Sequence, residues 1–294
     1  MSPKEITSKT FDAIMQLQGV DELKEVVRRL QKFQENRDRY SIADATLPNY
    51  LWLARRGGGV STCLNAFSEY LYADRIIEFT GIIKYVEFIP AYIDPKNYFS
   101  ELTRLNNTLT EIAGHHRYFK GIVCIIIDDW LEHLHETNFK NILDFIDNIN
   151  DRILAIFCAH TNDKRIIENI ESAIISYMRS ETVTLRFPDT NELIEFIEAK
   201  YLKKHNFFLA NDAKSLLAES VNETVAGKYF NGFKTINQLA NDIIHSLLST
   251  DLNSNEISAG MLGGFAKDSA YIKRIKASEG YRKIGFNVKE EYSK

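Results

Sequence analysis

The chain has 294 residues, of which 45% are hydrophobic and 26% charged, and its formal net charge is −4. This composition is typical of a globular protein with one large domain or two smaller ones, and it excludes a disordered or fibrous chain. The acidic balance excludes a bulk positive field, so we expect neither a nucleic-acid nor a membrane partner. The apolar run at residues 122–127 is too short for a membrane helix, and no signal-peptide pattern is visible. The three cysteines predict reduced, buried thiols and a cytoplasmic protein.

The first half of the sequence alternates between strand and helix patterns. Apolar residues at helical spacing over 23–33 predict an amphipathic helix, with Asp21 as a candidate N-cap. Residues 48–54 predict a strand, and a helical pattern begins directly after the glycine-rich segment that follows it. Further strands are predicted at 85–89, 121–127, 153–159 and 182–187, separated by helices at 98–113, 139–149 and 166–178. This alternation predicts an α/β fold with a parallel sheet and right-handed crossovers.

The pattern changes after Pro188. Residues 191–204, 212–221 and 235–248 all have helical periodicity, and no strand is predicted between them. The segment from residue 250 onward has weak periodicity and several glycines. We therefore expect an α/β domain over residues 1–188, a small helical domain over 189–250 and a C-terminal tail over 251–294, to which no role is assigned.

The glycine-rich segment has the context of a phosphate-binding P-loop, G-x-x-x-x-G-K-[ST]. Such a loop joins a strand to a helix, its backbone N–H groups and lysine bind phosphates, and its hydroxyl holds Mg²⁺. Here Ala54 replaces the first glycine and Val60 replaces the lysine. The residues that fit a phosphate site are Gly57, Gly58, Gly59, Ser61 and Thr62. A glycine-rich turn that only packs remains the alternative.

Two acids, Asp128 and Asp129, follow the apolar run that ends at Ile127. In an open α/β sheet, ligands bind at the carboxyl ends of the strands. In a P-loop protein the first acid orients Mg²⁺ and the second can activate water. The alternative is a pair of solvated loop acids. His160, at the end of a later strand, either faces the same edge or is a polar strand end with no chemical role.

With these motifs and their spacing, the chain resembles the AAA+ ATPases, and within them the CbxX/CfqX group, over about residues 15–250. Residues 17–24 look like the adenine-side motif and contain Gly19 and Val20. Residues 153–162 look like the sensor-1 strand, with Asn162 or Thr161 as the sensor. Residues 174–180 resemble the segment with the arginine finger, here Arg179, and residues 230–239 resemble the sensor-2 region, with Lys234 in place of arginine.

The resemblance implies a P-loop-type parallel sheet flanked by helices, followed by a small all-helical lid domain. It implies ATP or ADP as ligand, with Mg²⁺ held by Ser61 and Asp128, and catalytic roles for Asp129, Asn162 and Arg179. It also implies a homo-oligomer, or a hetero-oligomer with an active AAA+ paralogue, and a protein substrate or partner.

The departures from the family pattern point to impaired chemistry. Val60 removes the phosphate lysine, Asp129 stands where the family has glutamate, and Lys234 stands where it has arginine. We therefore expect an ATP-binding protein of the remodelling or chaperone type with weak or lost hydrolysis, and we leave open whether it is an enzyme. The alternative is a non-catalytic scaffold that binds no nucleotide. Whether Arg55 or Arg56 replaces the missing lysine is also left open.

Overall fold

The computed structural model describes the chain in two compact units, residues 1–187 and 188–294. The described residues are 3–41, 47–77, 85–89, 100, 103–104, 107, 121–128, 137–149, 153–228, 230–249 and 254–262. The helix predicted at 98–113 lies almost wholly outside these residues, as does Asp129. No described helix combines the length and apolar composition that crossing a bilayer requires.

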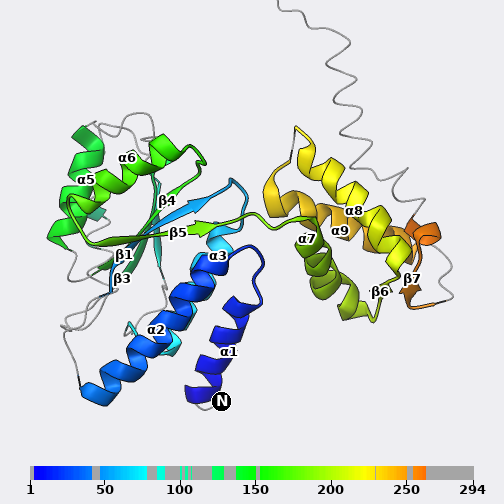
Figure 1. Ribbon diagram of the computed structural model, residues 1–294, viewed down its shortest axis with the longest axis horizontal. Helices are drawn as coiled ribbons and strands as arrows, with labels where there is room; N and C mark the ends of the chain where they lie inside the picture. The colour runs from blue at the N-terminus through cyan, green and yellow to red at the C-terminus, as the bar shows by residue number, and fades with distance from the viewer. Residues whose placement is uncertain are drawn as a thin grey trace, which may run out of the picture. The chain divides into compact units, whose positions relative to one another are not determined.

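Unit 1 is a parallel α/β unit, as the alternating pattern predicted (Figure 1). In its described part the sheet has five strands in the order β2-β3-β4-β1-β5. The strands are β1 (Asn49–Ala54), β2 (Val86–Phe88), β3 (Gly121–Ile126), β4 (Ile153–Ala159) and β5 (Ser180–Leu185). The helices of the described part are α1 (Pro3–Met15), α2 (Asp21–Tyr40), α3 (Val60–Ala73), α5 (Thr137–Asn148) and α6 (Lys164–Ile175).

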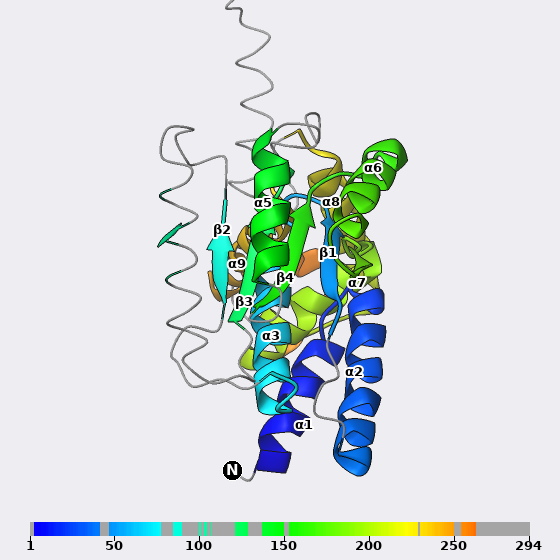
Figure 2. The same cartoon turned by 90° about the vertical axis from the view of Figure 1, so that its left-hand side faces the viewer.

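Two hydrophobic clusters cover the two faces of this sheet. Alternate strand residues point to opposite faces, so Tyr50 and Trp52 of β1 pack toward α1, α2 and α3. Leu51 and Leu53 pack toward α5 and α6 on the other face. Both of these helices can be seen in Figure 2. All six residues of β1 are buried, because the strand has neighbours on both sides and helices on both faces.

The parallel register fixes which residues share an edge of the sheet. Strand β1 pairs with β5 from Asn49 opposite Ser180 to Ala54 opposite Leu185, and with β4 on its other side. The carboxyl ends of β1, β3, β4 and β5 therefore meet at one edge, which we call the carboxyl edge. The starts of β1 and β5 lie at the opposite edge.

The N-terminal region differs from the prediction in two ways. Helix α1 was not anticipated; its Ile14 is fully buried and its Phe11 ring lies 6.2 Å from that of Tyr70 on α3. Asp21 is not an N-cap, because α2 begins at Asp21 itself and Val20 occupies the cap position. The Asp21 carboxylate instead contacts the Arg186 guanidinium, 3.4 Å away.

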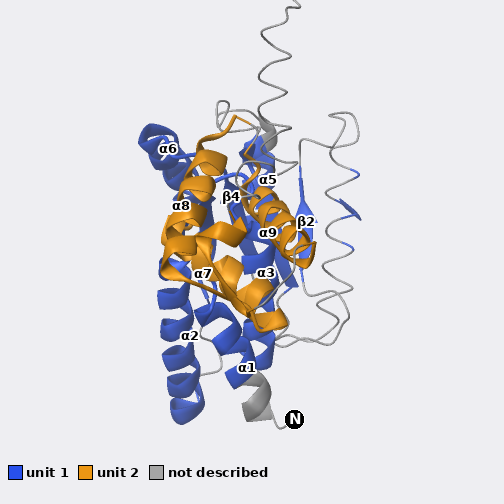
Figure 3. Ribbon diagram, turned by 90° about the vertical axis from the view of Figure 1, so that its right-hand side faces the viewer, with its two compact units in different colours: residues 1–187 blue, residues 188–294 orange. Residues whose placement is uncertain are grey.

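Unit 2 is mainly helical (Figure 3). It contains α7 (Thr190–Ile197), a π-helical turn (Glu198–Leu202), a 3₁₀ turn (Lys203–His205), α8 (Asn211–Ala226) and α9 (Gly232–Leu248). Asp189 and Glu192 form a capping box at the start of α7. The expectation of a domain without strands is wrong, because β6 (Phe208–Leu209) pairs in parallel with β7 (Glu256–Ile257). These strands have two residues each, too few to show an alternating pattern.

Candidate functional site

The loop between β1 and α3 forms a tight turn at the carboxyl edge. Gly57 and Gly59 have φ angles of 73° and 88°, which favour glycine. Gly58 donates its N–H to the Arg55 carbonyl at 2.9 Å, and a Cβ at this position would lie 2.7 Å from that oxygen. Each glycine is therefore required by the turn itself. Because the Gly58 N–H is used within the loop, it is not presented to a phosphate in this conformation.

Val60, which the sequence predicts at the lysine position of a P-loop, begins α3. Its side chain is half-buried and packs against the cluster beneath α1, α2 and α3. Ser61 and Thr62 follow it and are exposed in the first turn of α3. The cap residue, Gly59, has no side chain to bond the first N–H groups of this helix. The end of α3 therefore keeps the partial positive charge that attracts anions, but it has no lysine.

Asp128, two residues beyond the end of β3, is bonded by residues from two other segments of the carboxyl edge. Its Oδ1 accepts the backbone N–H of His160 at 2.9 Å, and the His160 Nδ1 lies 2.9 Å from Oδ2 and 3.1 Å from Oδ1. The Arg56 Nη2 of the glycine loop donates to Oδ2 at 3.3 Å. His160 therefore has a partner at this edge, and the Asp128 side chain is only 12% exposed.

These contacts decide the charge state of the carboxyl group. Burial alone would raise the pKa of Asp128, but the hydrogen bonds from the His160 side chain and backbone, together with the Arg56 charge, outweigh it. They hold the pKa of Asp128 below its usual value, so the group is a carboxylate at neutral pH.

The described residues do not fit a magnesium ion in this arrangement. Mg²⁺ takes oxygen ligands in near-octahedral geometry and commonly uses one or two carboxylates. Both oxygens of Asp128 already face nitrogen donors, and one of those donors is the cationic Arg56. No group of three acids, histidines or cysteines capable of holding a metal occurs among the described residues. A cation at Asp128 would also be repelled by the Arg56 guanidinium in its present position.

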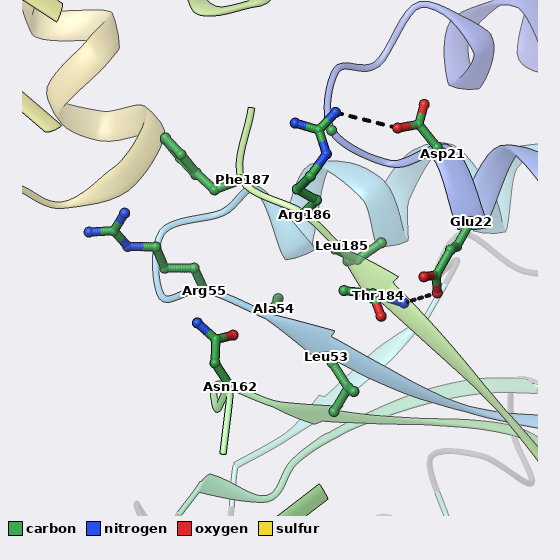
Figure 4. A pocket seen from close by; sticks show the side chains of 11 residues that line it. Asp21, Glu22, Leu53, Ala54, Arg55, Asn162, Thr184, Leu185, Arg186 and Phe187 are labelled. Carbon is green, nitrogen blue, oxygen red and sulfur yellow. Dashed lines mark hydrogen bonds and ion pairs between the residues drawn. The ribbon is translucent and has the colours of Figure 1, made fainter. Parts of the chain in front are cut away.

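A pocket of about 450 Å³ opens beside the glycine loop (Figure 4). Its walls come from the start of α2, the end of β1, the segment after β4, and the end of β5 with the residues that follow it. Glu22 accepts the backbone N–H of Thr184 at 2.6 Å, which joins α2 to β5. The Arg55 guanidinium lies 5.6 Å from the centre of the Phe187 ring. The lining residues are Gly19, Asp21, Glu22, Leu53, Ala54, Arg55, Asn162, Thr184, Leu185, Arg186 and Phe187.

Three of the segments predicted to contact a nucleotide meet at this pocket. Gly19 comes from the adenine-side motif, Arg55 from the glycine loop and Asn162 from the end of the sensor-like strand. Of the two sensor candidates, Asn162 lines the pocket, whereas the Thr161 hydroxyl accepts the backbone N–H of Asp163 at 3.1 Å. Val20, the other residue of the adenine-side motif, is buried in the cluster below.

Two other predicted residues lie elsewhere. Arg179 precedes β5 at the opposite edge of the sheet, about 20 Å from the glycine loop at about 3.3 Å per residue. Lys234 is exposed in the first turn of α9, in unit 2. The pocket also contains Arg186 and Phe187, which were not singled out as site residues. Their position directly after a strand adjacent to β1 is the signal that would have identified them.

The comparisons with known proteins bear on the fold. No protein-family model and no curated protein matches this sequence. Among solved structures, PCH-2 of C. elegans is similar with 13% identity and a TM-score of 0.55, over 90% of this chain and 72% of that chain. The FIGL-1 AAA domain is similar with 14% identity and a TM-score of 0.50, over 90% of this chain and 87% of that chain. The chain therefore has the fold of an AAA domain.

Proposed function

We propose that this chain is an AAA+ protein of the remodelling type, related to the CbxX/CfqX group, which binds ATP or ADP and hydrolyses it slowly or not at all. The observation that supports binding is the meeting of Gly19, Arg55 and Asn162 at one pocket. A volume of about 450 Å³ lies within the range of about 300–1,000 Å³ of small-molecule sites. The exposed N-terminus of α3 adds a backbone site for phosphate.

Slow hydrolysis follows from the groups that phosphoryl transfer needs. Val60 supplies neither charge nor donor, and its side chain packs into the protein. Loss of one preorganised donor typically lowers a rate by about 100- to 1,000-fold. Asp128 is held by Arg56 and His160, so the carboxylate expected to orient a metal is engaged within the protein. We expect nucleotide affinity to fall less than the rate of hydrolysis, because backbone amides can bind phosphate without the lysine and the metal-orienting carboxylate.

The two arginines of the glycine loop have different roles in this proposal. The Arg56 side chain pairs with Asp128, whereas that of Arg55 lines the pocket beside Phe187. Arg55 is therefore the residue that we expect to contact a phosphate in place of the missing lysine. A guanidinium supplies charge and paired donors to phosphate oxygens, although from another position in the loop.

The remaining predictions concern assembly and location. Because Arg179 lies about 20 Å from its own glycine loop, an arginine-finger role would require a neighbouring chain, in a homo-oligomer or beside an active AAA+ paralogue. In such a ring Lys234 would act as the sensor-2 residue and Asp129 as the weakened catalytic acid. A protein substrate or partner and a cytoplasmic location complete the proposal.

A non-catalytic scaffold that binds no nucleotide remains the second candidate function. The internal hydrogen bond of the Gly58 N–H and the Arg56–Asp128 pair favour it, because both close the phosphate side of the site.

A calorimetric titration with ATP and Mg²⁺ on wild type and Val60→Lys separates the two functions. Micromolar binding by wild type supports the nucleotide-binding proposal. If Val60→Lys binds ATP and wild type does not, the pocket is intact but needs a lysine at position 60 to bind nucleotide, and this contradicts the proposal. If neither wild type nor Val60→Lys binds ATP, the result favours the scaffold. Unchanged unfolding temperatures show that each variant is folded.

A further inference from the structure

A second pocket, of about 240 Å³, lies at the edge of the sheet opposite the glycine loop. It is formed by α2, by the residues before β1 and by the start of β5, and we call it the α2–β5 pocket. Its apolar side is made by α2 and the segment before β1, and includes Leu30, Phe33 and Leu47. Its polar side contains the side chains of Arg29, Tyr50, Arg179 and Glu181.

Tyr50 contributes to this pocket a hydroxyl that has no hydrogen-bond partner among the described residues. Its side chain is 1% exposed, and its ring is fixed by an edge contact with Phe67 at 5.6 Å. None of the described residues forms a hydrogen bond with the hydroxyl, and Tyr50 is one of the residues that line the pocket. A buried hydroxyl with no partner among the described residues favours a ligand that can accept a hydrogen bond from it.

One negative and two positive side chains act on the Tyr50 hydroxyl. Burial raises the pKa of Tyr50 most and Glu181 raises it further, while Arg29 and Arg179 oppose them, so the hydroxyl stays protonated and can donate. Arg29 forms an ion pair with Glu181. The Arg179 guanidinium has no hydrogen bond or ion pair with any residue in the described ranges. Two arginines against one glutamate leave one positive charge at the pocket, and it belongs to Arg179.

We propose that the α2–β5 pocket binds a carboxylate attached to a small apolar group. The carboxylate would accept hydrogen bonds from Arg179 and the Tyr50 hydroxyl, and the apolar group would lie against Leu30, Phe33 and Leu47. An arginine guanidinium matches the planar geometry of a carboxylate and can bond both oxygens. A pocket of about 240 Å³ is smaller than typical drug-sized sites. It therefore suits a ligand about as large as one amino acid, either a free acid or the last residue of a protein chain.

This inference does not depend on nucleotide binding, because its residues lie at the other edge of the sheet. It does concern Arg179, the proposed arginine finger. A bound carboxylate would occupy the guanidinium that a neighbouring chain's phosphate would need.

The test compares an acid with its uncharged amide on the full chain. Ligand-observed NMR with N-acetyl-leucine is expected to show binding, whereas N-acetyl-leucinamide, which has the same apolar group, is expected to bind at least about tenfold more weakly. Equal binding of acid and amide, or no binding of the acid at millimolar concentration, overturns the proposal. A capped peptide ending in leucine identifies the source: much tighter binding than the single acid indicates a chain terminus, and equal binding indicates a free acid.

Variants locate the site. Arg179→Gln is expected to weaken N-acetyl-leucine binding by about tenfold or more, and Tyr50→Phe, which keeps the ring, by a smaller factor. Arg28→Gln is the control, since Arg28 is an exposed arginine of α2 that pairs with Glu25 and does not line the pocket. An unchanged affinity in Arg179→Gln, or an equal loss in Arg28→Gln, contradicts the assignment. Circular dichroism of each variant separates loss of the ligand from loss of the fold.

Discussion

The Arg56 guanidinium lies 3.3 Å from the Asp128 carboxylate, although the two residues are 72 positions apart in the sequence. The positive charge of Arg56 thus lies beside the acid that the resemblance to the AAA+ ATPases suggests as a metal ligand. His160 holds the same carboxylate from the end of β4. The arrangement keeps Asp128 ionised without a metal, and it explains how a half-buried carboxylate is tolerated at this edge.

The Arg56–Asp128 pair predicts nucleotide binding with little dependence on magnesium. We expect the dissociation constant of ADP for wild type to change by less than about threefold between buffers with Mg²⁺ and with EDTA, equivalent to about 0.6 kcal/mol. Arg56→Gln removes the competing cation, so its affinity is expected to become magnesium-dependent. Arg39→Gln, at an exposed position in the last turn of α2, should behave like wild type. Strong magnesium dependence of wild type would refute this prediction.

Val60→Lys tests the cost of the missing lysine. A charge-assisted hydrogen bond is worth about 1.5–3 kcal/mol, so we expect ATP affinity to rise by about tenfold or more. The side chain is half-buried, and a lysine can extend its charged end to solvent, so unfolding free energy should fall by no more than about 1 kcal/mol. Val60→Met controls for side-chain length without charge. Calorimetry and urea unfolding measure the two quantities, and an equal gain in affinity with Val60→Met would exclude a charge effect.

Gly58→Ala tests the geometry of the loop. The added Cβ would lie 2.7 Å from the Arg55 carbonyl oxygen, so the turn must shift, at a cost of about 1–3 kcal/mol in unfolding free energy. Gly260→Ala is a matched control, because among the described residues its Cβ would meet only the Ser258 hydroxyl, at 3.7 Å. In the helical turn at Gly260, alanine should be neutral or stabilise by about 0.5–1 kcal/mol. Equal unfolding midpoints for the two variants in urea would show that the loop tolerates a side chain.

The cysteines should be unreactive in the folded protein. All three are free and buried, and burial raises the pKa of Cys63 to about 12. A raised pKa lowers the thiolate fraction, to about one in ten thousand at pH 8. A thiol reagent such as DTNB should therefore give almost no fast signal with native protein at pH 8, and three equivalents in guanidinium chloride. One equivalent of fast-reacting thiol in native protein that is absent in Cys63→Ala would show that Cys63 is accessible and would contradict this prediction.

The sheet and its carboxyl edge were predictable because the strands carry strong local signals. The apolar runs 121–127 and 153–159 are buried on both faces, and such strands show continuous rather than alternating hydrophobicity. The parallel order then brings the residues that follow β1, β3 and β4 to one edge without further information.

The unpredicted features depend on distant partners. Helix α1 is stable because Ile14 and Phe11 pack on α3, a contact that local periodicity does not reveal. Asp21 has a typical capping residue type, but its carboxylate pairs with Arg186 at the end of β5. The sequence also could not predict which loop arginine bonds Asp128, because Arg55 and Arg56 are adjacent and chemically identical. The conformation of the turn places the Arg56 side chain beside Asp128 and the Arg55 side chain in the pocket.

The most direct measurement is the fate of bound ATP. Wild-type protein is run by gel filtration in buffer that contains ATP, so that a micromolar complex stays loaded, and the nucleotide that co-elutes with it in excess of the buffer level is identified by chromatography over time. We predict that ATP co-elutes with the protein and is recovered mainly as ATP, because the pocket is present and the hydrolytic groups are missing or engaged. Recovery as ADP within a few typical turnover times, or elution of the protein without nucleotide in excess of the buffer level, would contradict the proposed function.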